Sequence, residues 1–443
     1  MLMIKLNSNF NFESQYSVKN ILIDSLLVLY LFIYIFSPPI VPNIRLILDV
    51  LNFIVVMICI LYNGKINIPL EVKKTVLPFI PFLLYIWLNA LYFIFIEKPV
   101  SLIAYDNSDF IRTAFMPIYI WLRLMALCFV LQLIKRKMKI KNENISNYIL
   151  IAGFLQFLCA MLAFLFPGIR DIFLQIINNN TEGAVQKSIF EALDGDKRCY
   201  GFSGNLFDSI GYIVSLISAI AFIKTISRKS IKYFICFICT VFIVLLNTRT
   251  GLVLDAISIV LISLFYARGN VMKNFIGYSV IAITMLIIGC YVISILPEST
   301  SSWVTEGLES VYNLLVEQEY SGIFLAFFLH HLNFPDDIIF GDGAIPDVMY
   351  YNVSDIGYVQ CIWRYGIVGT ILLMMGISYF FYSAYKKNRE SMGMQCFILC
   401  SSVIFFVYLI KLFSLYNLGG YAVFIPIIIM SLLEKDECND RIG

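Results

Sequence analysis

Charged residues are scarce in this sequence. Only 14% of the chain is Asp, Glu, Lys or Arg, whereas a soluble globular domain carries about 25%. Hydrophobic residues make up 60% of the chain. This composition argues against a soluble globular protein and indicates an integral membrane protein.

Other common signatures are also missing. The chain has two histidines, and its 11 cysteines show no CxxC or Cys/His spacing of the kind that binds metals. Most cysteines lie in apolar runs, where a thiol acts as a small hydrophobe, so we expect no disulfide framework. The net charge of +2 comes from basic residues scattered over short loops, which argues against a nucleic-acid partner. The first apolar run lacks a small-residue cleavage site and is read as a first span.

What the chain does contain is a series of apolar runs of about 20 residues, the length that crosses a bilayer as a helix. Because lipid cannot satisfy backbone polar groups, we expect these runs to be helices. The sequence therefore predicts an all-α polytopic membrane protein, a single transmembrane unit over residues 1–443 with about 12 transmembrane helices. The predicted spans are 21–37, 44–62, 76–96, 114–134, 148–167, 205–223, 231–246, 251–267, 275–296, 356–384, 395–412 and 418–433.

The basic residues predict how these spans are oriented. With a cytoplasmic N-terminus, the inner segments hold 21 of the 32 Lys and Arg residues and the outer segments hold 8. The positive-inside rule then places both termini in the cytoplasm. Two larger extracytoplasmic loops follow, at 168–204 and 297–355. The second loop holds ten acidic residues and no Lys or Arg.

Three arginines come to the outer side in this topology. Arg198 and Arg249 each precede a span, and Arg364 lies about two turns into the span 356–384. A guanidinium is always charged and forks onto phosphate oxygens, so all three are candidates to bind a diphosphate. The alternative for Arg198 and Arg249 is that they extend to lipid headgroups. Arg364 is the stronger candidate, because a charge inside a span is costly without a partner.

A fourth arginine, Arg123, lies in the predicted span 114–134. We expect it either to pair with an acid such as Asp255 or Asp208 or to line a cavity. A purely structural role for the whole chain is disfavoured, because an arginine inside a span raises the free energy of the protein and is usually retained for a function.

The large loop and the helix after it carry candidates for acid–base chemistry and substrate binding. Asp355 and Tyr358 share a helix face, so Asp355 is either a general base toward a sugar hydroxyl or a first-turn residue favoured by the helix dipole. His330 and His331 are a weak metal signal, and one of them is a candidate proton acceptor. Asp342 lies between two glycines, where the backbone can approach a ligand closely.

The order of these short motifs resembles the O-antigen polymerase and O-antigen ligase superfamily over residues 198–380. Ligases of that group usually show a His-Asn pair before the tyrosine that opens the last-loop helix, whereas Ser354 and Asp355 stand there in this chain. The resemblance therefore favours a polymerase. The segments that carry it are Arg198–Phe202, Thr248–Gly251, Ile338–Gly343, Ser354–Tyr358 and Tyr365–Gly369.

The resemblance implies a C-type glycosyltransferase-like fold that uses no metal and no cofactor. It implies transfer of a growing glycan from undecaprenyl diphosphate to the non-reducing end of a new lipid-linked repeat unit, at the outer face of the bacterial inner membrane. The three outer arginines would hold the diphosphate, Asp355 with a loop histidine would activate the acceptor, and Asp342 and Tyr358 would contact the substrate. The implied partners are the undecaprenyl-diphosphate-linked oligosaccharide, membrane lipid and a chain-length regulator protein.

Two other functions stay open at this point. One is an O-antigen ligase of the same superfamily, against which the Ser354–Asp355 departure argues. The other is a lipid-linked oligosaccharide flippase or another transporter. Transporters tend to contain related halves around a midplane site, and this chain shows no internal repeat.

Overall fold

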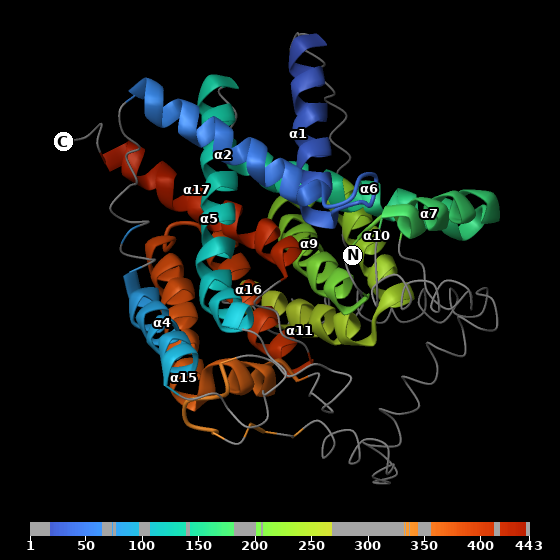
Figure 1. Ribbon diagram of the computed structural model, residues 1–443. Helices are drawn as coiled ribbons and strands as arrows, with labels where there is room; N and C mark the ends of the chain where they lie inside the picture. Colours follow the sequence, from blue (N-terminus) through green and yellow to red (C-terminus); the bar gives the residue numbers. More distant parts are fainter. Residues whose placement is uncertain are drawn as a thin grey trace, which may run out of the picture.

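The computed structural model describes residues 18–63, 73, 77–96, 107–138, 142–180, 201–204, 207–267, 332, 334–335, 337–343, 356–411 and 417–439. Every regular element in these segments is a helix, and Figure 1 shows how the helices pack. They are α1 (Val18–Phe36), α2 (Ile44–Asn63), η1 (Leu77–Phe79), α4 (Ile80–Phe95), α5 (Asn107–Met138), α6 (Asn142–Leu165), α7 (Pro167–Asn180), α9 (Phe207–Arg228), α10 (Ile231–Asn247), α11 (Arg249–Tyr266), α15 (Gly357–Lys387), α16 (Met392–Lys411) and α17 (Leu418–Asn439).

The described chain has the helices of a membrane protein. Seven segments are long and apolar enough to cross a bilayer, namely those of α2, η1 with α4, α5, α6, α9, α15 and α16. Shorter apolar helices occupy α1, α10, α11 and α17. Helices thus lie in eleven of the twelve predicted spans, and the twelfth, 275–296, lies outside the described residues. The number of crossings and their orientation stay predictions.

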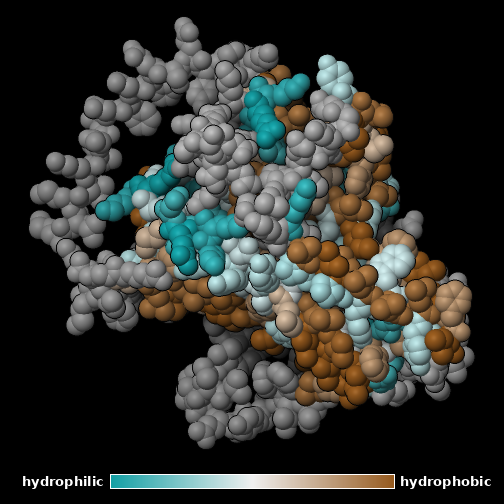
Figure 2. All heavy atoms as spheres, turned by 90° about the vertical axis from the view of Figure 1, so that its left-hand side faces the viewer, coloured by the Kyte–Doolittle hydropathy of each residue, from teal (hydrophilic) through white to brown (hydrophobic). Residues whose placement is uncertain are grey.

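The helices differ in how much of their surface is covered. In the apolar stretch of α9, 78% of the residues are buried, whereas in that of α2 only 11% are. Figure 2 shows one face of the molecule, where hydrophobic side chains cover broad areas and most hydrophilic ones lie toward one side. α9 is therefore central, and α2 presents apolar side chains such as Ile54 and Met57 outward, as a helix in contact with lipid does.

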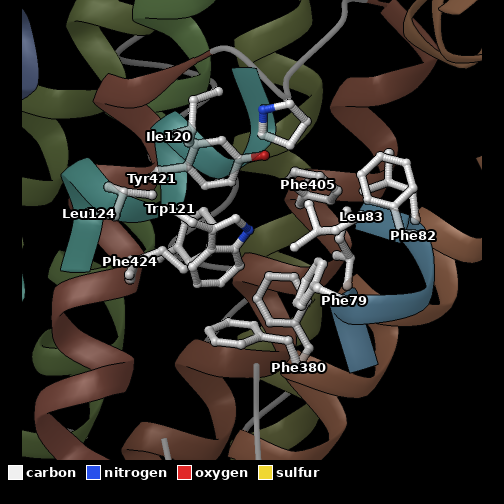
Figure 3. Close-up of a pocket in the computed structure, with 15 residues that line it drawn as sticks. Phe79, Phe82, Leu83, Ile120, Trp121, Leu124, Phe380, Phe405, Tyr421 and Phe424 are labelled. Carbon is white, nitrogen blue, oxygen red and sulfur yellow. The ribbon is translucent and has the colours of Figure 1, made fainter. Parts of the chain in front are cut away.

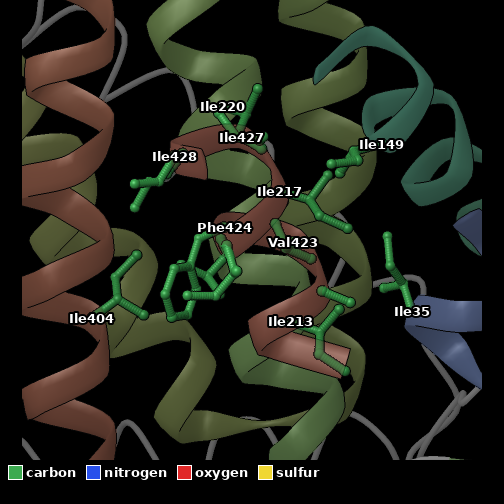
Figure 4. Close-up of a cluster of buried hydrophobic side chains, with 14 of the residues drawn as sticks. Ile35, Ile149, Ile213, Ile217, Ile220, Ile404, Val423, Phe424, Ile427 and Ile428 are labelled. Carbon is green, nitrogen blue, oxygen red and sulfur yellow. The ribbon is translucent and has the colours of Figure 1, made fainter. Parts of the chain in front are cut away.

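The core forms around α9. Its buried isoleucines face α16 and α17, and Figure 4 shows these side chains packed together. Near its N-terminal end α9 also approaches α11 closely, since Gly211 leaves no room for a Cβ beside the Thr248 side chain. Thr248 caps α11, with its Oγ1 accepting from the Gly251 N–H at 2.9 Å.

The predicted outer loop 168–204 is partly regular. Its first part forms the helix α7, and residues 181–200 lie outside the described part of the chain. Its end is held against the end of α1, because the Gly204 N–H donates to the Phe36 carbonyl at 3.1 Å. The Ser203 hydroxyl donates to the same carbonyl at 2.9 Å.

Candidate functional site

The candidate site is built around a break in α15. Gly366 lies inside this helix with φ 62° and ψ −177°, a backbone conformation that is open essentially only to glycine. The helix therefore has a first half, residues 357–365, and a second half, residues 367–387. Figure 1 shows the chain changing direction between the two.

The turn at residues 337–343 fills this break. The first two N–H groups of the second half donate to the carbonyl oxygens of Ile338 and Ile339, at 2.9 and 3.2 Å. In the opposite direction, the Asp342 N–H donates to the Trp363 carbonyl at 2.8 Å. The turn thus supplies backbone partners that the interrupted helix has lost, as a backbone in apolar surroundings requires.

Short-range bonds and two glycines set the shape of this turn. One carboxyl oxygen of Asp337 accepts from the N–H groups of Ile339 and Phe340, at 2.9 and 3.0 Å. Gly341 has φ 75°, and a Cβ there would collide with the backbone nitrogen of Gly366. A Cβ on Gly366 would in turn collide with the Ile339 carbonyl oxygen. The two backbones can approach this closely only because both positions are glycine.

Helix α4 holds the turn from another side. The Tyr85 hydroxyl lies 2.8 Å from the Tyr365 carbonyl oxygen and 3.1 Å from that of Phe340. Asn89 donates to the Phe340 carbonyl at 2.8 Å. Gly343 packs against phenylalanine rings of α4 and α5 that leave no room for a Cβ. The turn, α4, α5 and α15 therefore form one connected unit.

The break divides the predicted span that contains Arg364. The sequence predicted one continuous span over 356–384, with Arg364 about two turns inside it. Arg364 lies about two turns into α15, at the end of its first half and two residues before the break, and it is half-buried. Its depth in a bilayer stays a prediction. The second half begins after Gly366 and has 21 residues (387 − 367 + 1), which is itself enough to cross a bilayer. Arg364 thus precedes the bilayer-length half and does not lie within it.

Asp342 and Tyr358 are both placed by the structure. Asp342 is 1% exposed, and its backbone bond to Trp363 puts it beside the segment that carries Arg364. Tyr358 lies in the first turn of α15, where its hydroxyl donates to the Phe406 carbonyl of α16 at 3.0 Å. The structure therefore brings Asp342 and the Arg364 segment together and gives the Tyr358 hydroxyl a partner in α16.

The other predicted site residues lie outside what the structure describes. These are Asp355, His330, His331 and Arg198, together with the side chain of Arg249, whose backbone begins α11. Their proposed roles stay predictions.

Arg123 has a different partner from the acids expected. It is buried in α5 and forms an ion pair with Asp49 of α2. Asp255 bonds instead to Ser218 of α9, and the side chain of Asp208 lies outside the described residues. Asp49 is the acid within the apolar run 44–62, and an acid inside a predicted span is itself a signal of a buried partner.

In the sequence, the more obvious partner for Asp49 is a nearby arginine on the same helix. Arg45 stands four residues before Asp49, the spacing of an ordinary ion pair along one helix. Arg45 instead donates to the carbonyl oxygens of Tyr34 and Ile35, each at 2.9 Å. The Tyr34 hydroxyl donates to Asp49 at 2.7 Å. A polar network thus joins α1, α2 and α5, and it anchors α2, most of whose surface faces outward.

An apolar cavity lies among α4, α5, α15, α16 and α17. It offers about 50 Å³ of space for water-sized molecules. Figure 3 shows Phe79, Trp121, Phe380 and Phe424 around it. Phe82 links the cavity to the break, because its ring meets that of Tyr365 edge-on at 5.2 Å. The lining contains no charged side chain, so the cavity suits a small apolar group and not an ionic one.

This arrangement has the parts of a site for an amphipathic anion. A glycine-rich turn, whose residues 341–343 are buried, and the segment that carries Arg364 meet at a helix break, and an apolar cavity lies nearby. Comparison with family models, with curated proteins and with solved structures finds no match to this chain.

Proposed function

We propose that this protein is a membrane glycosyltransferase that polymerises lipid-linked oligosaccharide repeat units. It would transfer the growing glycan from undecaprenyl diphosphate to the non-reducing end of a new repeat unit, at the outer face of the inner membrane. The observation that carries the proposal is the seating of the 337–343 turn in the break of α15. Two motifs of the superfamily resemblance, Ile338–Gly343 and Tyr365–Gly369, meet there through backbone hydrogen bonds.

Arg364 supports the proposal by its position along α15. Because the second half of this helix is long enough to cross a bilayer alone, Arg364 would lie at the outer mouth of that span, at the level of a lipid-linked diphosphate. A guanidinium there would neutralise charge that builds up on the departing diphosphate. Arg198 and Arg249 complete the proposed diphosphate site.

The apolar surroundings of the break suit a lipid-linked substrate. Ile338, Ile339 and Phe340 are exposed on the turn, and Ile367 and Val368 are exposed at the start of the second half. An exposed apolar face at this place fits contact with lipid chains better than contact with water. The adjoining cavity extends the apolar surroundings into the bundle.

The acceptor hydroxyl needs a base, and we propose Asp355 together with His330 or His331 for this role. Asp355 comes two residues before Gly357, where α15 begins, so it lies near the first half of the helix in sequence. Asp342 is proposed to contact the substrate from the buried end of the turn, and Tyr358 by its ring.

The proposal is tested in the native host by deleting the gene and separating the surface polysaccharide by size. The null strain is expected to carry core with one repeat unit and no ladder. Wild type should restore the ladder and Arg364→Ala should not, at matched membrane levels. Arg389→Ala is the control, because it removes an exposed arginine just beyond the other end of α15.

Two results would count against the proposal. A full ladder with Arg364→Ala would remove Arg364 from the diphosphate site. A null strain in which no repeat unit reaches the core would overturn the polymerase assignment. Lipid-linked units accumulating outside would then indicate a ligase, and units accumulating inside would indicate a flippase.

A further inference from the structure

Asp255 is a buried polar group that the proposed function does not use. It lies inside α11 and is 2% exposed. Its Oδ1 is hydrogen-bonded to the hydroxyl of Ser218, on the neighbouring helix α9. An ionisable side chain inside an apolar helix of a membrane protein is costly, and it calls for an account of what neutralises it.

A count of hydroxyl hydrogens leaves two arrangements for this contact. The Ser218 hydroxyl also lies 3.1 Å from the backbone carbonyl oxygen of Ser215. Because a hydroxyl has one hydrogen, it can donate to only one of these two oxygens. The Ser215 hydroxyl is engaged elsewhere, since it donates to the Gly251 carbonyl at 3.1 Å. If Ser218 donates to Ser215, the hydrogen between Ser218 and Asp255 must come from the carboxyl group.

The second carboxyl oxygen supports the same conclusion. Oδ2 of Asp255 is buried and has no hydrogen-bond partner among the residues that the structure describes. A carboxylate would leave negative charge on that oxygen without a donor, whereas the carbonyl oxygen of a neutral acid carries far less charge. Asp49 differs from Asp255 in this respect, because the charge of its carboxylate is stabilised by the ion pair with Arg123 and by a hydrogen bond from the Tyr34 hydroxyl.

No cationic side chain takes the place of a proton in the described part of the chain. Asp255 forms no ion pair with any side chain that the structure describes there. The charged residues of α11 and of the helices packed around it are Asp208, Lys224, Arg228, Lys232, Arg249 and Lys411.

We propose that Asp255 is a proton-binding site within the helix bundle. The bound state is the neutral carboxylic acid, which donates to Ser218 and joins α11 to α9. Release of the proton to water leaves a carboxylate at this interface with one unsolvated oxygen, which weakens the contact between the two helices. This site is separate from the break in α15 and does not depend on the proposed function.

The test compares wild type with Asp255→Asn, purified in the same detergent, by thermal unfolding at several pH values. Asparagine has nearly the same shape, donates to Ser218 and stays neutral, so subtracting its midpoint removes the effect of every other titrating group. The folded protein keeps a proton that the unfolded chain releases, so stability should fall as pH rises. The wild-type midpoint is expected to fall by about 2–4 °C relative to Asp255→Asn between mildly acidic and alkaline pH.

A second measurement covers the case in which Asp255→Asn does not fold. An apolar carbodiimide adds across a protonated carboxyl group to give an N-acylurea, which peptide mass mapping detects. We expect this adduct on Asp255 of wild type, declining as pH rises, and none on Asp49.

Three outcomes would overturn the proposal. The first is a midpoint difference that does not change with pH. The second is an Asp255 that stays unmodified at every pH. The third is a stabilisation by sodium chloride over choline chloride that is present in wild type and absent in Asp255→Asn, because it would assign the site to a metal cation.

Discussion

Replacing Gly366 by alanine tests whether the docked turn holds the break in α15. The position has φ 62° and ψ −177°, and such a conformation costs another residue about 1–3 kcal/mol. The new Cβ would also collide with the Ile339 carbonyl oxygen, so the turn must move. Losing the two bonds from the start of the second half costs about 0.5–1.5 kcal/mol each. Together these terms predict a destabilisation of about 2–6 kcal/mol.

The assay is equilibrium unfolding of the purified protein in detergent micelles, with Gly393→Ala as the matched control. Gly393 lies in α16, and a Cβ there would meet only the Tyr266 hydroxyl at 3.4 Å and Ile223 at 3.7 Å. Alanine in an unstrained helix is more favourable than glycine by about 0.5–1 kcal/mol. The control should therefore be neutral or slightly stabilising. Equal unfolding midpoints for the two variants would refute the seating of the turn at Gly366.

Three further substitutions probe other contacts, each measured by the same unfolding assay. Asp49→Asn should destabilise the protein by about 3–5 kcal/mol, because it leaves the buried charge of Arg123 without its partner; adding Arg123→Gln should recover part of the loss, and no recovery would contradict the ion pair. Tyr85→Phe should cost about 1–3 kcal/mol, because the Tyr365 carbonyl freed by the break loses its donor; an unchanged midpoint would show that another donor reaches it. Thr248→Ala should cost about 1 kcal/mol through loss of the α11 cap, whereas Thr248→Ser should keep most of it.

The positions of the helices were predictable because the signal is local. Apolar runs near bilayer length must be helical in lipid, whatever their neighbours, and helices lie in all the predicted spans that the structure describes. The close backbone approach at the 338–343 segment was also predictable from a local signal, since a glycine stands on each side of Asp342. The roles proposed for Asp355, His330, His331 and Arg198 were read from the same local patterns and stay predictions.

The sequence by itself determined that the chain is a helical membrane protein and which short segments are unusual within it, because composition and the length of apolar runs act residue by residue. Only the tertiary structure decided what those segments contact. Nothing in the order of residues joins Asp49 to Arg123, and nothing in 356–384 shows that its helix breaks at Gly366. Both depend on partners distant in the chain, namely a charge on another helix and carbonyl groups on a turn. These partners stabilise a buried ion or an interrupted helix only once the fold brings them together.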